Sequence, residues 1–219
     1  FANRKSIFLE KWPKFNGDLV NIQLEEAIDR SREIVSLANA ARMKARIKRR
    51  WPIKKALICL SDSRLTSMEK ILEILRVQLN VEKYDIVVIN DKTELEKMLS
   101  LVEKKLPVVP IVRLVKKHIA SKVKADIEKV VRAFEKIDKL ELLTTLYSNH
   151  TYHLSYEGGT IEISSPDIEL SYKTTQEYVM AEKDDTLVFI TTKRDQDLII
   201  KGLLRDLARN LQQLRKERH

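Results

Sequence analysis

The feature that most constrains the fold of this chain is a change in the period of its apolar residues. From residue 21 to 49 apolar residues recur every three or four positions, which is typical of one long amphipathic helix. Between 54 and 105 β-branched runs alternate with helical runs, and between 151 and 191 short strand-like segments follow one another. These periods predict an α+β or α/β class, with a long basic helix followed by a mixed α/β domain with antiparallel hairpins and a C-terminal helix.

The first half of the mixed region predicts alternating strands and helices. Strands are expected at 54–60 and 84–89, with some parallel pairing, because a helical run follows each of them. Capping-box patterns at 66–69 and 93–96 predict the starts of the two helices. Residues 107–147 are also expected to be helical.

The second half predicts hairpins and a closing helix. Glycines and aspartates at 157–159 and 183–185 indicate two hairpin turns. The strand candidates are 151–156, 160–164, 168–173, 177–181 and 186–191. A last helix is expected at 195–218. Its expected inward face consists of Leu198, Leu203, Leu207, Leu211 and Leu214.

Positive charge is concentrated in the first quarter of the chain. The net charge is +9, and residues 1–55 hold 14 Lys and Arg against 6 Asp and Glu, with no acid from Ile34 to Ser61. Cations at this density bind phosphates without reading sequence, and an aromatic side chain beside them is able to stack on an unpaired base. The RNA-binding candidates are therefore Arg42, Lys44, Arg46, Lys48, Arg49, Arg50, Trp51, Lys54 and Lys55.

Two plainer interpretations of this segment stay open. The cations would also suit a solvated helix surface that binds nothing. The indole of Trp51 would also suit ordinary packing of a helix against a strand. The sequence alone does not choose between these interpretations and RNA binding.

Catalytic equipment is not evident in the chain. His150 and His153 are three positions apart but lack a third ligand at a spacing that zinc uses. The single cysteine, Cys59, lies in an apolar run and is expected to be a buried, inert thiol. No apolar run approaches the ~20 residues that span a bilayer. We therefore expect no catalytic residue, metal or cofactor in this chain, and a cytoplasmic location.

Four segments resemble isoleucyl-tRNA synthetases, which are class I aminoacyl-tRNA synthetases, and they occur in the family's order. Residues 6–13 resemble Ser-Ile-His-Leu-x-x-Trp-Pro, with Phe8 in place of His, and residues 79–81 resemble Leu-Asn-Val. Residues 202–217 resemble the family's Gly-Leu-x-Arg-Glu-Leu helix. Residues 41–53 resemble Arg…Lys-x-x-Ile-Lys-x-Arg-x-Pro-Leu, with matches at Arg42, Lys44, Ile47, Lys48, Arg50 and Pro52. Arg46, Arg49 and Trp51 depart from the commoner family residues, so any role for them rests on the charge argument alone.

The resemblance implies a C-terminal fragment of a longer enzyme, and a first residue other than Met agrees with this. Residues 1–52 would be the end of the helical anticodon-binding domain, and residues 53–219 the C-terminal α/β junction domain. The implied partners are isoleucine tRNA, through its anticodon stem-loop, and the rest of the parent chain.

The parent ligates isoleucine to its tRNA using ATP and Mg on a core whose His-Ile-Gly-His and Lys-Met-Ser-Lys-Ser signatures are absent here. The fragment itself is therefore expected to be inactive. Two alternatives remain open at this stage. One is a free-standing RNA-binding or scaffold protein, and the other is the equivalent fragment of valyl- or leucyl-tRNA synthetase.

Overall fold

The computed structural model describes residues 14–123 and 126–218. The α-helices are α1 (Ile22–Lys44), α2 (Glu69–Leu79), α3 (Glu94–Glu103), α4 (Lys116–Val123), α5 (Ile127–Lys136), α6 (Lys139–Asn149) and α7 (Gln196–Glu217). The strands are β1 (Ile53–Leu60), β2 (Val81–Val88), β3 (Val108–Leu114), β4 (Thr151–Tyr156), β5 (Gly159–Ser164), β6 (Ile168–Thr174), β7 (Tyr178–Lys183) and β8 (Thr186–Thr191). Short 3-10 turns lie at Gly17–Leu19, Arg64–Ser67 and Ser165–Asp167.

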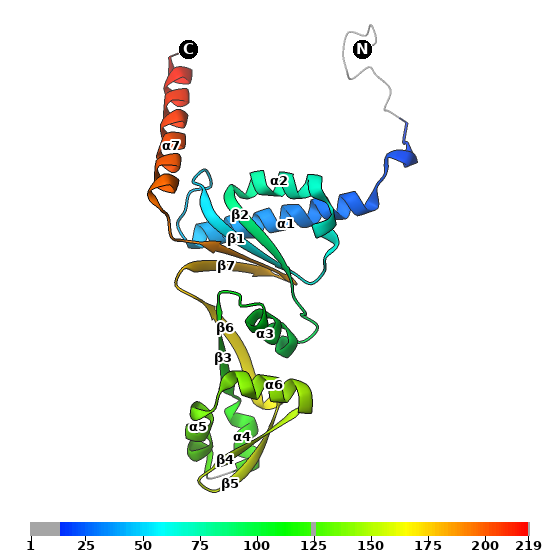
Figure 1. Ribbon diagram of the computed structural model, residues 1–219, viewed down its shortest axis with the longest axis vertical. Coiled ribbons are helices and arrows are strands. Elements are labelled where there is room, and N and C mark those ends of the chain that lie inside the picture. The colour runs from blue at the N-terminus through cyan, green and yellow to red at the C-terminus, as the bar shows by residue number, and fades with distance from the viewer. Residues whose placement is uncertain (1–13, 124–125, 219) are drawn as a thin grey trace.

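A four-stranded sheet with the order β2-β1-β8-β7 forms the upper lobe (Figure 1). Strand β1 pairs with β2 in parallel, as the alternation of strand and helix predicted, and with β8 in antiparallel. Helix α2 is the crossover between the two parallel strands, which a tight turn cannot join. Asn80 ends α2 in the left-handed region, at φ 50°, and β2 begins at the next residue.

Both faces of this sheet are covered by helices (Figure 1). Ile34 and Ala41 of α1 are fully buried and share one core with Ile58 of β1 and Val188 of β8. Phe189 packs on the opposite face with Leu101 of α3. Helix α1 is therefore built into the same core as the sheet. A domain boundary after residue 52 stays a prediction about the parent protein.

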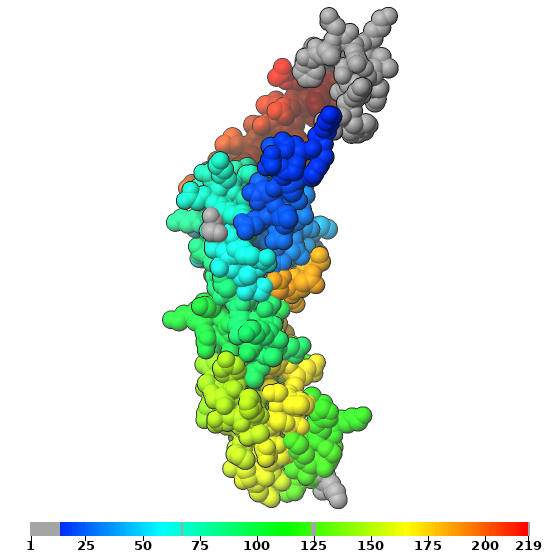
Figure 2. Space-filling model, turned by 90° about the vertical axis from the view of Figure 1, so that its right-hand side faces the viewer, coloured from blue at the N-terminus to red at the C-terminus, as the bar shows by residue number. Residues whose placement is uncertain are grey.

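The lower lobe is inserted between β2 and β7 and gives the molecule its elongated outline (Figure 2). The antiparallel ribbon β3–β6 leads into it, and helices α4 to α6 pack there with the hairpin β4–β5. Its core includes Val130, Phe134, Leu142, Leu146 and Ile163. The two predicted hairpin turns are confirmed, and Asp184 in the second turn has φ 51°.

The prediction that residues 107–147 are wholly helical is wrong at its first part, because Val108–Leu114 is strand β3. This segment is rich in β-branched residues, which suit a strand better than a helix. Pro110 is tolerated because β3 pairs with only one strand, β6, among the described elements, and edge strands accept proline.

Two further expectations on the helices need correction. Helix α2 begins at Glu69 with Met68 as its N-cap, and no side chain caps it, so the capping box at 66–69 is wrong. At the next helix, by contrast, Thr93 accepts the Glu96 backbone N–H at 3.1 Å, as predicted.

Helix α7 also differs from its prediction. Leu198 is fully buried, but the other leucines expected to face inward are 53–56% exposed: Leu203, Leu207, Leu211 and Leu214. Helical spacing shows which residues share a face and does not show that another element covers that face.

Candidate nucleic-acid interface

The basic segment, residues 42–55, is helical over fewer residues than its sequence predicted. Helix α1 ends at Lys44, not near residue 49, and Arg46 takes a left-handed φ of 54°. The chain then turns back, so that the N–H of Ile47 donates to the Arg42 carbonyl at 2.9 Å and the Ile47 side chain enters the core. The cations after residue 44 are therefore presented by a turn rather than by a helix surface.

Arg42 lies inside the protein and is only 2% exposed. Its guanidinium donates to the carbonyls of Trp51 at 2.7 Å, Leu79 at 2.8 Å and Asn80 at 3.0 Å. Burial, followed by the nearby charges of Arg205 and Arg49, lowers the pKa of Arg42 to about 10, so the group stays charged at neutral pH. The donors of Arg42 bind this chain's own carbonyls, which assigns the side chain a structural role, and an RNA contact by Arg42 stays a prediction.

Asp206 of α7 collects three donors from the basic segment. Lys48 Nζ lies 2.9 Å from its carboxylate, Trp51 Nε1 donates to it at 3.1 Å, and the Arg50 guanidinium forms an ion pair with it. The hydrogen bonds from Lys48, Trp51 and Arg50 lower the pKa of Asp206 to about 2. These contacts fasten α7 to the turn that follows α1.

Trp51 takes the packing role that its sequence left open. Its ring lies against Gly202, where an added Cβ would come within 2.5 Å of the indole. The guanidinium of Arg194 lies 5.0 Å from the ring centroid, a cation–π distance. A base that stacked on this indole would have to displace one of these neighbours.

Three more of the predicted cations have partners within the chain. Lys44 Nζ donates to the Met180 carbonyl at 3.1 Å. Lys54 pairs with Asp195 at 2.7 Å and Lys55 with Asp85 at 2.6 Å. These partners come from β7, from the start of α7 and from β2, which are remote from the basic segment in sequence. The lysine side chains in the two ion pairs are 60% and 39% exposed.

Arg46 and Arg49 are the cations that remain available for an outside ligand. Both are exposed, and neither forms an ion pair with any residue that the structure describes. The ammonium of Lys48, with a side chain 61% exposed, lies on the same turn. The structure thus narrows the candidate interface to Arg46, Lys48 and Arg49, which form the tip of the turn after α1.

Two residues outside the predicted RNA-binding set, Asn80 and Arg205, organise this region. Asn80 donates from Nδ2 to the Arg49 carbonyl at 3.1 Å, and its Oδ1 accepts from Arg205 at 2.6 Å. Arg205 also donates to the Arg50 carbonyl at 2.9 Å. Both residues belong to segments that resemble the synthetase family, 79–81 and 202–217. Three of the four resembling segments therefore meet at one junction, and the fourth, 6–13, lies outside the described residues.

The described residues also bear on metal, membrane and thiol chemistry. Among residues 14–123 and 126–218, no group of three His, Cys, Asp or Glu side chains is placed to hold a metal ion. No helix within that part of the chain is long and apolar enough to cross a membrane. Cys59 is buried, as expected, and burial raises the pKa of its thiol to about 12.

Comparison with known proteins bears on the whole length of the chain. No family model matches it. Its curated relatives include aminoacyl-tRNA ligases, a class of enzymes. In particular, they include the isoleucine–tRNA ligases of Thermococcus kodakarensis (27% identical), Methanosarcina mazei (29%) and Sulfolobus acidocaldarius (26%). The alignments cover 97–99% of this chain and 18–19% of those proteins. The resemblance to isoleucyl-tRNA synthetases is confirmed, and the chain spans about a fifth of the length of these relatives.

Proposed function

We propose that this chain is the tRNA-contacting C-terminal part of an isoleucyl-tRNA synthetase, and that the tip of the turn after α1 contacts the anticodon stem-loop. The observation that carries the proposal is similarity to isoleucine–tRNA ligases over nearly the entire chain. The parent enzyme would ligate isoleucine to tRNA with ATP and Mg in a core outside this chain, in the cytoplasm. The fragment contributes binding and no catalytic residue.

The electrostatic role falls to Arg46 and Arg49. Because neither side chain is neutralised by a described carboxylate, both are free to release counterions from RNA phosphates. The turn after α1 is held in place by Arg42, Arg50 and Trp51. These three residues affect tRNA binding only by fixing the shape of that turn.

The test is a filter-binding titration of the full parent synthetase with isoleucine tRNA across a range of salt concentrations. The variant R46A/R49A removes two phosphate contacts, and the log–log salt slope is expected to shrink by about 1.4, at ~0.7 per single-stranded contact. The matched control R113A/R132A removes two exposed arginines of the lower lobe and is expected to leave the slope unchanged. Equal slopes for R46A/R49A and the unmodified enzyme would contradict the proposed contact.

Two comparisons test which part of the tRNA is contacted and which amino acid the parent enzyme attaches. An anticodon hairpin and a hairpin with a changed anticodon are expected to differ in affinity for the parent enzyme, and equal affinities would place the contact on another part of the tRNA. Charging of the parent enzyme with isoleucine, valine and leucine distinguishes the three related synthetases.

A further inference from the structure

Helix α7 has one face on the protein and a second face with no described neighbour. Leu198, Gly202 and Asp206 follow one another at intervals of four and lie against the upper lobe. The next positions on that side, Arg209 and Gln213, are polar and exposed. The helix runs on past Asp206 to Glu217, roughly 16 Å at 1.5 Å per residue, and projects from the sheet (Figure 1).

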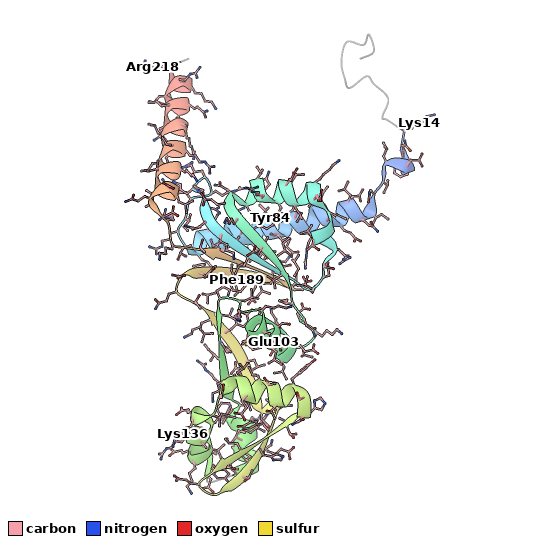
Figure 3. All side chains as sticks on the ribbon, in the orientation of Figure 1. Lys14, Tyr84, Glu103, Lys136, Phe189 and Arg218 are labelled. Carbon is pink, nitrogen blue, oxygen red and sulfur yellow. The ribbon has the colours of Figure 1, made fainter. Side chains whose placement is uncertain are left out.

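The second face of α7 is apolar along the whole helix. At 100° per residue, its large apolar side chains occupy a sector of about 140°. Each of them is 40–59% exposed: Ile199, Ile200, Leu203, Leu204, Leu207, Leu211 and Leu214. Figure 3 shows these outer turns, as far as the labelled Arg218, standing clear of the other described elements. A contiguous apolar stripe of this kind marks an interaction surface.

A second exposed apolar stretch lies near the start of the described chain. It comprises Phe15, Leu19, Val20, Ile22 and Leu24, which are 41–87% exposed. In Figure 1 this arm and α7 both extend from the α2 side of the sheet. One side of the molecule therefore presents two apolar surfaces that the described residues leave uncovered.

We infer that the apolar face of α7 is the surface on which the parent chain packs an amphipathic helix from outside this fragment. The inference rests on the proposed function, which supplies that parent chain. About four-fifths of the length of these relatives lies outside the part that this chain matches, so ample sequence exists to provide the helix. A second copy of this chain is the competing occupant.

The shape and the charges of the face specify its partner. Spacings of three and four along Ile200, Leu203, Leu207, Leu211 and Leu214 form the kind of straight seam that a second helix fills with side chains. Arg215 borders one edge of that seam, and Arg218, the C-cap, lies at the C-terminal end of the seam. The partner helix is therefore expected to carry an apolar stripe, with Asp or Glu at the positions that meet this basic edge.

The experiment measures amide hydrogen exchange of residues 207–217 in the full parent enzyme and in the isolated chain. Exchange is expected to be at least tenfold slower in the parent. In the parent, L207E/L211E is expected to remove that protection, whereas the matched control A208E/Q212E, on a different exposed face of α7, is expected to change it less than twofold. Because all four side chains are exposed, neither variant is expected to change the urea midpoint of the isolated chain.

Two results would overturn the inference. One is equal exchange of these amides in the parent and in the isolated chain. The other is a dimer of the isolated chain in light scattering that L207E/L211E dissociates, which would assign the face to a second copy. Neither result changes the salt slope of tRNA binding, so failure of this inference is distinguishable from failure of the proposed function.

Discussion

Replacement of Arg42 by alanine tests whether this arginine stabilises the fold or binds RNA. Three of its hydrogen bonds, to Trp51, Leu79 and Asn80, are 2.7–3.0 Å long, and a fourth to Lys48 is weaker at 3.5 Å. Net values of roughly 1.5–3 kcal/mol for each of the three charged bonds would sum to more than 4 kcal/mol. The desolvation of the buried guanidinium, which the variant no longer bears, offsets part of this sum. We expect R42A to lower the free energy of unfolding by about 3–5 kcal/mol.

The assay is urea unfolding of this chain in a W12F background, so that the emission comes from Trp51, whose carbonyl accepts from the Arg42 guanidinium. With a slope of roughly 2–3 kcal/mol per molar urea, the expected loss moves the midpoint down by about 1–2.5 M. The control R46A removes an exposed arginine and is expected to change stability by less than about 0.5 kcal/mol. In tRNA binding by the parent enzyme, R46A is the variant expected to reduce the salt slope.

One combination of results would refute this reasoning. If R42A unfolds at the same urea concentration as the unmodified chain and yet reduces the salt slope of tRNA binding, Arg42 contacts RNA and the buried role assigned to it is wrong.

Three further predictions concern the junction and the sheet. G202A places a methyl group 2.5 Å from the Trp51 ring, and the resulting strain of roughly 1–3 kcal/mol is expected to outweigh the gain in helix propensity. The urea midpoint is therefore expected to fall, and an unchanged midpoint would contradict the close packing. The pKa of Asp206 is about 2 in the folded chain against ~3.9 unfolded, so its contribution to stability is complete above pH ~4 and is lost as the pH falls toward 2. D206N is therefore expected to abolish an acid transition in the Trp51 emission of a W12F chain. Native Cys59 is expected to resist thiol reagents at pH 8 until the chain unfolds, and rapid native labelling would contradict its burial.

Much of the fold follows from the period of apolar residues. The long first helix, the parallel pair β1–β2 and the hairpin turn at Gly158 and Gly159 were each predicted, because each has a local pattern that physical chemistry explains. Strand β3 was missed because its β-branched residues lie between predicted helices, and its pairing partner β6 begins about 50 residues later. The exposure of the outer leucines of α7 was missed for a similar reason, because tertiary packing decides which turns of a helix are covered.

The candidate site was harder to predict for the same reason. An acid-free stretch identified a cluster of cations, yet its carboxylate partners arrive from elsewhere. Asp206 follows Arg50 by more than 150 residues, and no periodicity connects them. Only the folded chain distinguishes Arg42, buried under carbonyls, from Arg46, exposed four positions later.

The order of the strands has a consequence for synthesis on the ribosome. Ala56 in the central strand β1 pairs with Ile190 in β8, which is translated about 130 residues later. At ~5–20 residues per second, that interval lasts roughly 7–27 s. The inserted lobe is completed within this interval, so it is able to fold first, while one edge of β1 stays open to chaperones or to wrong neighbours.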